Sequence, residues 1–78
     1  MENEIVKNIL IIVLELDPNI SMEEVDSDNI ALWDSMRMLS IVAALENEFG
    51  LFIDASDAVN LTSYNNIIKF LENHPEME

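Results

Sequence analysis

The chain has 78 residues, no cysteine and a formal net charge of −13, with 16 acidic residues against 3 basic ones. This length makes one small domain, residues 1–78, and without disulfides or thiolate metal sites its stability must come from packed apolar side chains. The acidic surface repels nucleic acid and anionic membranes, so we expect neither as a ligand and expect basic surfaces on partner proteins instead.

An all-α fold of four helices, three main and one short, is predicted because apolar residues recur at helical spacing and strand-like alternation is absent. The first helix spans about Glu2 to Leu16 and ends at Asp17-Pro18, since the residue before a proline is disfavoured in the α region. Its predicted buried stripe comprises Ile5, Ile9, Ile12, Val13 and Leu16. Ile11 and Leu14 fall toward the polar side, either at the edge of the stripe or on a weak self-association surface.

A long connection from Asp17 to Trp33 follows. It contains a short turn, Ser21-Met22-Glu23-Glu24, with the spacing of a capping box. Four apolar residues are predicted to hold the connection against the bundle: Val25, Ile30, Leu32 and Trp33. Two aspartates here fit the start of a calcium loop, but alanine and arginine stand at its glycine and final positions. We therefore predict no metal site.

The second helix is predicted from Ser35 to Phe49, with Asp34 as its N-cap and Gly50 ending it in a left-handed conformation. Its predicted core face is Met38, Ile41, Val42, Leu45 and Phe49. The residues predicted to face outward or to lie at the edge are Met36, Arg37, Ser40, Ala43, Ala44, Glu46 and Asn47.

Two further helices complete the predicted bundle. A short third helix covers about Asp54 to Asn60, capped by Asp54 or Ser56. The fourth runs from about Ser63 to Asn73, and its predicted buried residues are Tyr64, Ile67, Ile68 and Leu71. The end that follows, from His74-Pro75, is expected to fray.

The start of the second helix is the most informative part of the sequence for function. Because Asp34 is a good N-cap, Ser35 falls in the first helical turn, where free N–H groups and the positive end of the helix dipole stabilise an attached anion. A serine hydroxyl in this place is suited to carry a covalently attached phosphate. Taken alone, Asp34-Ser35 is more often a plain helix cap.

The sequence around Ser35 resembles the acyl carrier protein family. The family pattern is Asp-Ser-Leu opening an apolar helix, then an acidic Leu-Glu-x-Glu-Phe-Gly stretch. The matching segments here are Leu32-Trp33-Asp34-Ser35-Met36-Arg37-Met38-Leu39 and Ala44-Leu45-Glu46-Asn47-Glu48-Phe49-Gly50-Leu51-Phe52-Ile53. Met36 stands where leucine is usual, and the Leu-Gly that many fatty-acid-type members place before Asp-Ser is missing. The resemblance continues through Ala58, Leu61-Thr62-Ser63 and the last helix, and so covers nearly the whole chain.

The resemblance implies a stand-alone carrier. A phosphopantetheinyl transferase would move the 4′-phosphopantetheine of coenzyme A onto the Ser35 hydroxyl, with Asp34 placed for recognition and for contact with the transferase's metal ion. The thiol of that arm would hold acyl or aminoacyl groups as thioesters for fatty acid, polyketide or related specialised biosynthesis. It would be the only thiol of the protein. The other implied partners are a loading ligase and downstream acyltransferases or synthases.

A partner-docking strip is predicted beside Ser35, on Met36, Arg37, Ser40, Ala43 and Glu46. Many family members have an acid where Arg37 stands, so this arginine reverses the local charge and indicates a different set of partners. The alternative for this strip is an ordinary solvated helix face. The core residues between the second and third helices either part to admit an acyl chain or serve as core only: Met38, Ile41, Val42, Leu45, Ile53, Ala58 and Leu61.

Nothing in the sequence indicates an enzyme. The single histidine, His74, has no nucleophile nearby in sequence, and the carboxylates are spread over solvated helix faces. The longest apolar run, Ile9 to Leu14, is far shorter than the roughly 20 residues that span a membrane. Without a recognisable targeting segment, a cytoplasmic monomer is expected. The alternative function is an unmodified acidic helical adaptor for basic partner proteins, and the Asp34-Ser35 helix start favours the carrier.

Overall fold

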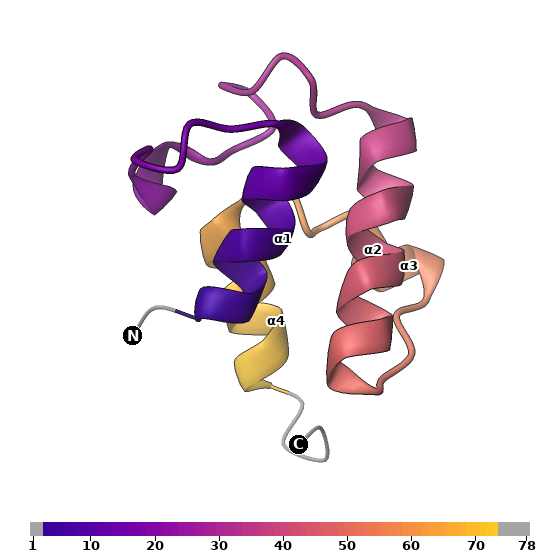
Figure 1. Ribbon diagram of the computed structural model, residues 1–78. Coiled ribbons are helices and arrows are strands. Elements are labelled where there is room, and N and C mark those ends of the chain that lie inside the picture. Colours follow the sequence, from indigo (N-terminus) through magenta and orange to yellow (C-terminus); the bar gives the residue numbers. More distant parts are fainter. Residues whose placement is uncertain (1–2, 74–78) are drawn as a thin grey trace.

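The computed structural model describes residues 3–73, and these form a small all-α bundle of three main helices and one short helix (Figure 1). The main helices are α1 (Glu4–Leu14), α2 (Ser35–Phe49) and α4 (Tyr64–Glu72). The minor elements are the 3-10 turn η1 (Met22–Glu24) and the short helix α3 (Ala55–Ala58). The predicted fold class is therefore confirmed.

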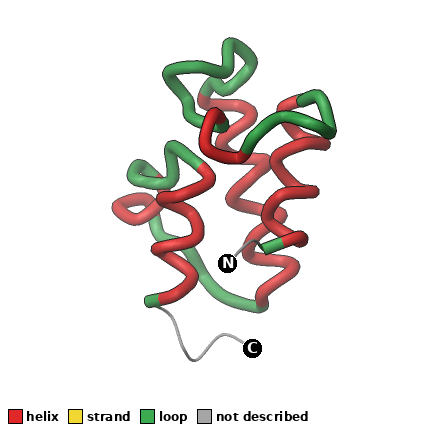
Figure 2. The backbone as a smooth tube through the Cα atoms, turned by 90° about the vertical axis from the view of Figure 1, so that its left-hand side faces the viewer, coloured by secondary structure: helices red, strands yellow, loops and turns green. Residues whose placement is uncertain are grey.

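α1 is the central helix of the bundle, because it packs against both α2 and α4. In Figure 1, α1 runs upward and α2 runs downward beside it, so the end of α1 lies near the start of α2. The long connection between these two helices crosses that end of the bundle and carries η1, which packs against α4. Figure 2 shows the same arrangement from the side, with helices and loops as the only elements of the described chain.

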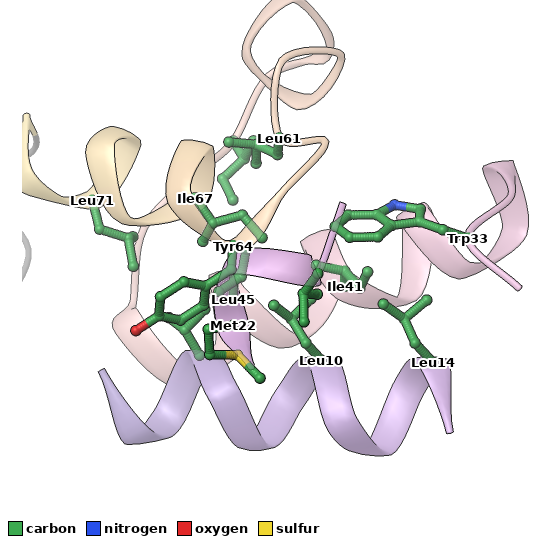
Figure 3. Close-up of a cluster of buried hydrophobic side chains, with 13 residues drawn as sticks. Leu10, Leu14, Met22, Trp33, Ile41, Leu45, Leu61, Tyr64, Ile67 and Leu71 are labelled. Atoms are coloured by element: carbon green, nitrogen blue, oxygen red, sulfur yellow. The ribbon is translucent and has the colours of Figure 1, made fainter. Parts of the chain in front are cut away.

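The predicted buried face of α1 is only partly right: Ile9, Val13 and Leu16 pack against the core while partly buried, but the face that α1 buries most completely is a different one. The residues that α1 buries almost completely are Val6, Leu10 and Leu14, and Figure 3 shows Leu10 and Leu14 pointing into the core. Ile12, assigned to the core, is 74% exposed, whereas Leu14, assigned to the polar side, is 1% exposed. Eight of the 11 residues of α1 are apolar, so their spacing fits more than one face. Packing against α2 and α4 selects the face that contains Leu10.

α1 is also shorter than predicted. It begins at Glu4, with Asn3 as N-cap accepting hydrogen bonds from the Ile5 and Val6 amides at 3.1 and 3.2 Å. It ends at Leu14, because Glu15 adopts a left-handed conformation with φ of 56°. The N–H groups of Glu15 and Leu16 then both reach back to the Ile11 carbonyl. The predicted start at Glu2 lies outside the described residues.

The other helix boundaries follow their capping residues. α2 has the predicted bounds, since Asp34 caps its start and Gly50 ends it with φ of 64°. α4 is capped by Ser63, whose hydroxyl accepts the Asn66 amide hydrogen bond at 3.0 Å. α3 is shorter than predicted and is capped by Asp54. The predicted fraying from His74 lies outside the described residues.

Hydrogen bonds hold the long connection against α4. The Ser27 amide donates to the Thr62 carbonyl at 2.8 Å, and the Tyr64 amide donates to the Val25 carbonyl at 3.0 Å. The Tyr64 hydroxyl in turn accepts the Asn3 amide hydrogen bond at 2.8 Å. Tyr64 therefore joins the start of α1, the connection and the start of α4.

Apolar residues of the connection and of α2 complete the core. Val25 and Trp33 are buried as predicted, and Ile30 packs against the core from its edge. Leu32 is exposed, contrary to prediction: its neighbour Trp33 occupies the core, and consecutive side chains of a non-helical segment point to different sides. Among the predicted core residues, the fully or nearly buried ones are Ile41, Leu45, Ile53, Leu61, Tyr64, Ile67 and Leu71. Those that pack against this cluster while partly buried are Met38, Val42, Phe49, Ala58 and Ile68.

Candidate functional site at the start of α2

The start of α2 presents an exposed serine beside two unused backbone donors. Ser35 is the first residue of α2, and its side chain is exposed. The Asp34 carboxylate accepts the Arg37 amide hydrogen bond at 2.9 Å, and the Asp34 carbonyl accepts that of Met38 at 2.9 Å. Within residues 3–73 the amides of Ser35 and Met36 have no acceptor, so they are available to an anion attached to the serine hydroxyl.

Trp33 fixes the position of this helix start. Its indole ring is buried among the core residues, and the two residues that follow it, Asp34 and Ser35, are both exposed. Figure 3 shows the ring lying close to Ile41 of α2. The indole Nε1 is buried and has no hydrogen-bond partner in the described part of the chain. The helix start that carries Ser35 is therefore anchored to the core by the residue two positions before it.

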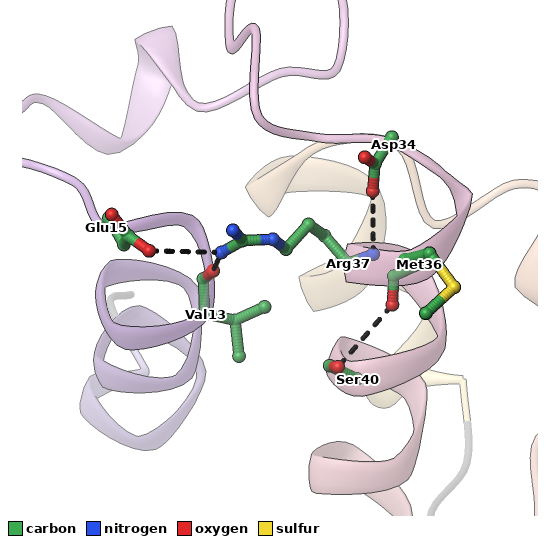
Figure 4. Close-up of polar contacts among 6 residues, drawn as sticks. All are labelled: Val13, Glu15, Asp34, Met36, Arg37 and Ser40. Carbon is green, nitrogen blue, oxygen red and sulfur yellow. Dashed lines mark hydrogen bonds and ion pairs between the residues drawn. The ribbon is translucent and has the colours of Figure 1, made fainter.

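Arg37, a predicted docking residue, reaches back across the bundle to α1 (Figure 4). Its guanidinium donates a short hydrogen bond to the Val13 carbonyl and forms an ion pair with Glu15 at 3.5 Å. The Val13 carbonyl is one of the last four of α1, where the helix dipole favours a cation. Arg37 therefore caps the end of α1, and its side chain is only 33% exposed.

The middle of the predicted docking strip is exposed and mostly apolar. Met36 is 72% exposed, and Ser40 and Ala43 are exposed on the same helix. Leu39, which the prediction omitted, is 66% exposed. Its spacing of three residues after Met36 and four before Ala43 is the signal that would have identified it. Between Arg37 and Glu46 the helix has no charged residue.

Glu46 lies at the other end of the strip and binds within the molecule. Its carboxylate accepts the hydrogen bond of the Ile53 amide at 2.8 Å, and its side chain is partly buried. This contact joins the last turns of α2 to the segment before α3. The structure therefore gathers Met36, Ser40 and Ala43 beside Ser35, whereas Arg37 and Glu46 make contacts that hold α2 in the fold.

The carboxylate of Asp54 lies at the start of α3. Hydrogen bonds from the Asp57 amide and from the Ser56 hydroxyl, both at or below 2.9 Å, lower the pKa of Asp54 from its usual value of 3.8.

Among residues 3–73, no three or more His, Cys, Asp or Glu side chains are grouped to hold a metal ion. In that same range no helix combines the length and the apolar character required to cross a membrane.

Comparison of the chain with protein-family models, with curated proteins and with solved structures finds no match. The chemistry of the site therefore has to be inferred from its own geometry. Its main features are an exposed serine hydroxyl in the first turn of a 15-residue helix, two free amides beside it and an apolar strip next to it.

Proposed function

We propose that this protein is an acyl or aminoacyl carrier whose 4′-phosphopantetheine arm is attached to Ser35. The observation that carries the proposal is the exposed Ser35 side chain at a helix start with unused backbone donors. The residues fit the group because the hydroxyl is accessible to a transferase and a phosphodiester there lies at the positive end of α2. When attached, the arm supplies a terminal thiol that holds the cargo as a thioester.

The chain's own residues have separate roles in this proposal. Ser35 supplies the oxygen of the phosphodiester. The Asp34 carboxylate accepts the hydrogen bond of the Arg37 amide, so the amides of Ser35 and Met36 remain available to the phosphate. A phosphate at this end of α2 is stabilised by about 0.3–1 kcal/mol through the helix dipole. The exposed Asp34 carboxylate is also placed for recognition by the transferase and for contact with its metal ion.

The proposed partners are a phosphopantetheinyl transferase, a loading ligase and downstream acyltransferases or synthases. They would meet the strip formed by Met36, Ser40 and Ala43, to which the exposure of Leu39 adds a fourth residue. Because the chain has no cysteine, the arm would carry the only thiol, and cargo could not migrate to a side-chain thiol. A cytoplasmic location belongs to the proposal, since a cysteine-free chain gives no sign of an oxidising compartment.

The test is the intact mass of the protein after incubation with coenzyme A and a promiscuous phosphopantetheinyl transferase. We expect one phosphopantetheine per chain in the wild type and none in Ser35→Ala. Ser40→Ala, which removes an exposed hydroxyl of the same helix, is the matched control and should be modified normally. Circular dichroism should find Ser35→Ala folded, since Asp34 still caps α2 and the loss is no more than about 1 kcal/mol.

Modification that maps to Ser21, Ser40 or Ser63, or that persists in Ser35→Ala, would refute the assignment. If an active transferase leaves the wild type unmodified while it modifies a known carrier in the same mixture, the carrier function is wrong. An unmodified acidic adaptor for basic partners would then be the remaining candidate.

A further inference from the structure

α1 has a second apolar side that the bundle leaves uncovered. Ile5 is half-exposed and Ile12 is largely exposed, on the side of α1 away from the buried Leu10. With Ile9 and Asn8 they line a shallow groove of about 250 Å³, which Glu48 of α2 closes on its other side. The exposed isoleucines lie beside the polar residues Glu4 and Asn8, and exposed apolar side chains with a polar rim are typical of interaction surfaces. This groove therefore has the character of a docking surface.

Acidic residues border the groove. Glu48 lines it from α2, and the exposed Glu4 lies in the first turn of α1, next to Ile5. Lys7, the one basic residue of α1, is partly buried and stands seven residues before Leu14, on the side of the helix that faces the core. The apolar groove therefore has carboxylates at its border and no cation among the residues that line it.

We propose that this groove binds an amphipathic helix of another protein, with apolar side chains in the groove and Lys or Arg residues along its border. The charge selects this occupant. A second copy of the chain would bring another net charge of −13 and would place Glu4 and Glu48 against equally acidic borders. A basic flank on a partner helix meets the same carboxylates favourably. The proposal does not rest on the carrier function, because none of the groove residues belongs to the Ser35 site.

The groove is small, so the interaction it supports is weak and transient. Stable protein interfaces bury about 800 Å² on each partner, and a groove lined by the side chains of five residues is well below that. Truncation of one buried isoleucine at such a contact should weaken binding by roughly tenfold. Because part of the attraction is between exposed charges, binding should also weaken with added salt.

The test uses the full chain, isotope-labelled for NMR, and a synthetic helical peptide of Leu and Lys with its leucines on one face. We expect amide shift changes at Ile5, Ile9, Ile12 and Glu48, and roughly tenfold weaker binding by Ile12→Ser. Met36→Ser is the matched control, since Met36 is an equally exposed apolar residue on α2, and it should bind the peptide like the wild type. A peptide with the same composition but scattered leucines controls for charge alone and should bind more weakly.

Glu48→Gln leaves the apolar surface intact and should weaken binding at low salt only, which keeps the test valid if Ile12→Ser is unstable. The proposal would be overturned by any of three results: shift changes centred on α2, equal binding of the peptide by Ile12→Ser and the wild type, or no binding of the peptide at all. So would sedimentation data that reveal a dimer abolished by Ile12→Ser, because the occupant would then be a second copy.

Discussion

Replacement of Arg37 by glutamine should destabilise the protein through the loss of its contact with the end of α1. A hydrogen bond from a charged donor contributes about 1.5–3 kcal/mol, and the one to the Val13 carbonyl should lie at the low end because Arg37 is 33% exposed. The ion pair with Glu15 adds at most about 0.5 kcal/mol, since the glutamate is 67% exposed. We therefore expect a loss of about 1–2 kcal/mol, or roughly 4–16 °C in Tm for a domain of this size.

The assay is thermal unfolding followed by circular dichroism, at low and at high salt. Lys69→Gln is the matched control, because it removes an exposed cation of α4 and likewise takes the formal net charge from −13 to −14. Glu15→Gln removes the ion pair but keeps the hydrogen bond to Val13. Most of the effect of Arg37→Gln should persist at high salt, since the main acceptor is a neutral carbonyl.

Equal Tm values for Arg37→Gln and Lys69→Gln would refute this reasoning. They would mean that the bridge from α2 to α1 contributes nothing and that only net charge matters. A loss that disappears at high salt would assign the effect to the ion pair with Glu15 rather than to the cap on α1.

Three other predictions concern backbone strain, acidity and partner choice. Glu15→Gly should raise Tm by a few degrees, because glycine adopts the left-handed conformation of this position without strain, and this gain of about 0.5–1 kcal/mol exceeds the loss of an exposed ion pair. An unchanged or lower Tm would contradict it. Added salt, or a fall in pH from 7 to about 5, should raise Tm by relieving repulsion among carboxylates. Asp54 acts in the opposite sense. Its pKa is lowered in the folded state, so its contribution to folding stability is present above pH 3.8 and is lost as the pH falls through the lowered pKa. A steady fall of Tm from neutral pH would show that favourable acid contacts outweigh the repulsion. If the protein is the proposed carrier, Arg37→Asp should lower kcat/KM for loading by its cognate enzyme and raise it for fatty-acid-type enzymes. The change should be a few-fold at low salt and smaller at high salt, and equal loading of wild type and Arg37→Asp by both enzyme types would exclude a role for Arg37 in partner choice.

The sequence identifies α2 well because its two ends carry unambiguous signals. Asp34 has a side chain suited to cap a helix start, and Gly50 is the only residue of the chain without a side chain to oppose a left-handed conformation. Both effects are local, so the neighbouring residues suffice to predict them. The exposure of Ser35 follows directly from its place in the first turn.

Long-range packing decides the features that the sequence did not predict. The face that α1 buries depends on α2 and α4, because eight of its 11 residues are apolar and its three polar residues mark only a narrow part of the solvent side. Glu15 ends α1 without a glycine signal. The contact of Arg37 with Val13 joins residues 24 positions apart, and helical spacing within α2 alone places that arginine in the docking strip.

The construction of α3 has a consequence for local stability. The segment 54–60 contains no buried residue, and the two buried side chains that flank it, Ile53 and Leu61, belong to the core on either side. Opening of this segment would expose little apolar surface and would leave both flanking residues in place. Its free energy of opening should therefore be far below that of global unfolding, whereas the amides around Tyr64 can be released only when α1, the connection and α4 separate. The bundle thus combines a slowly exchanging region around Tyr64 with a short segment, 54–60, that opens many times for each unfolding event.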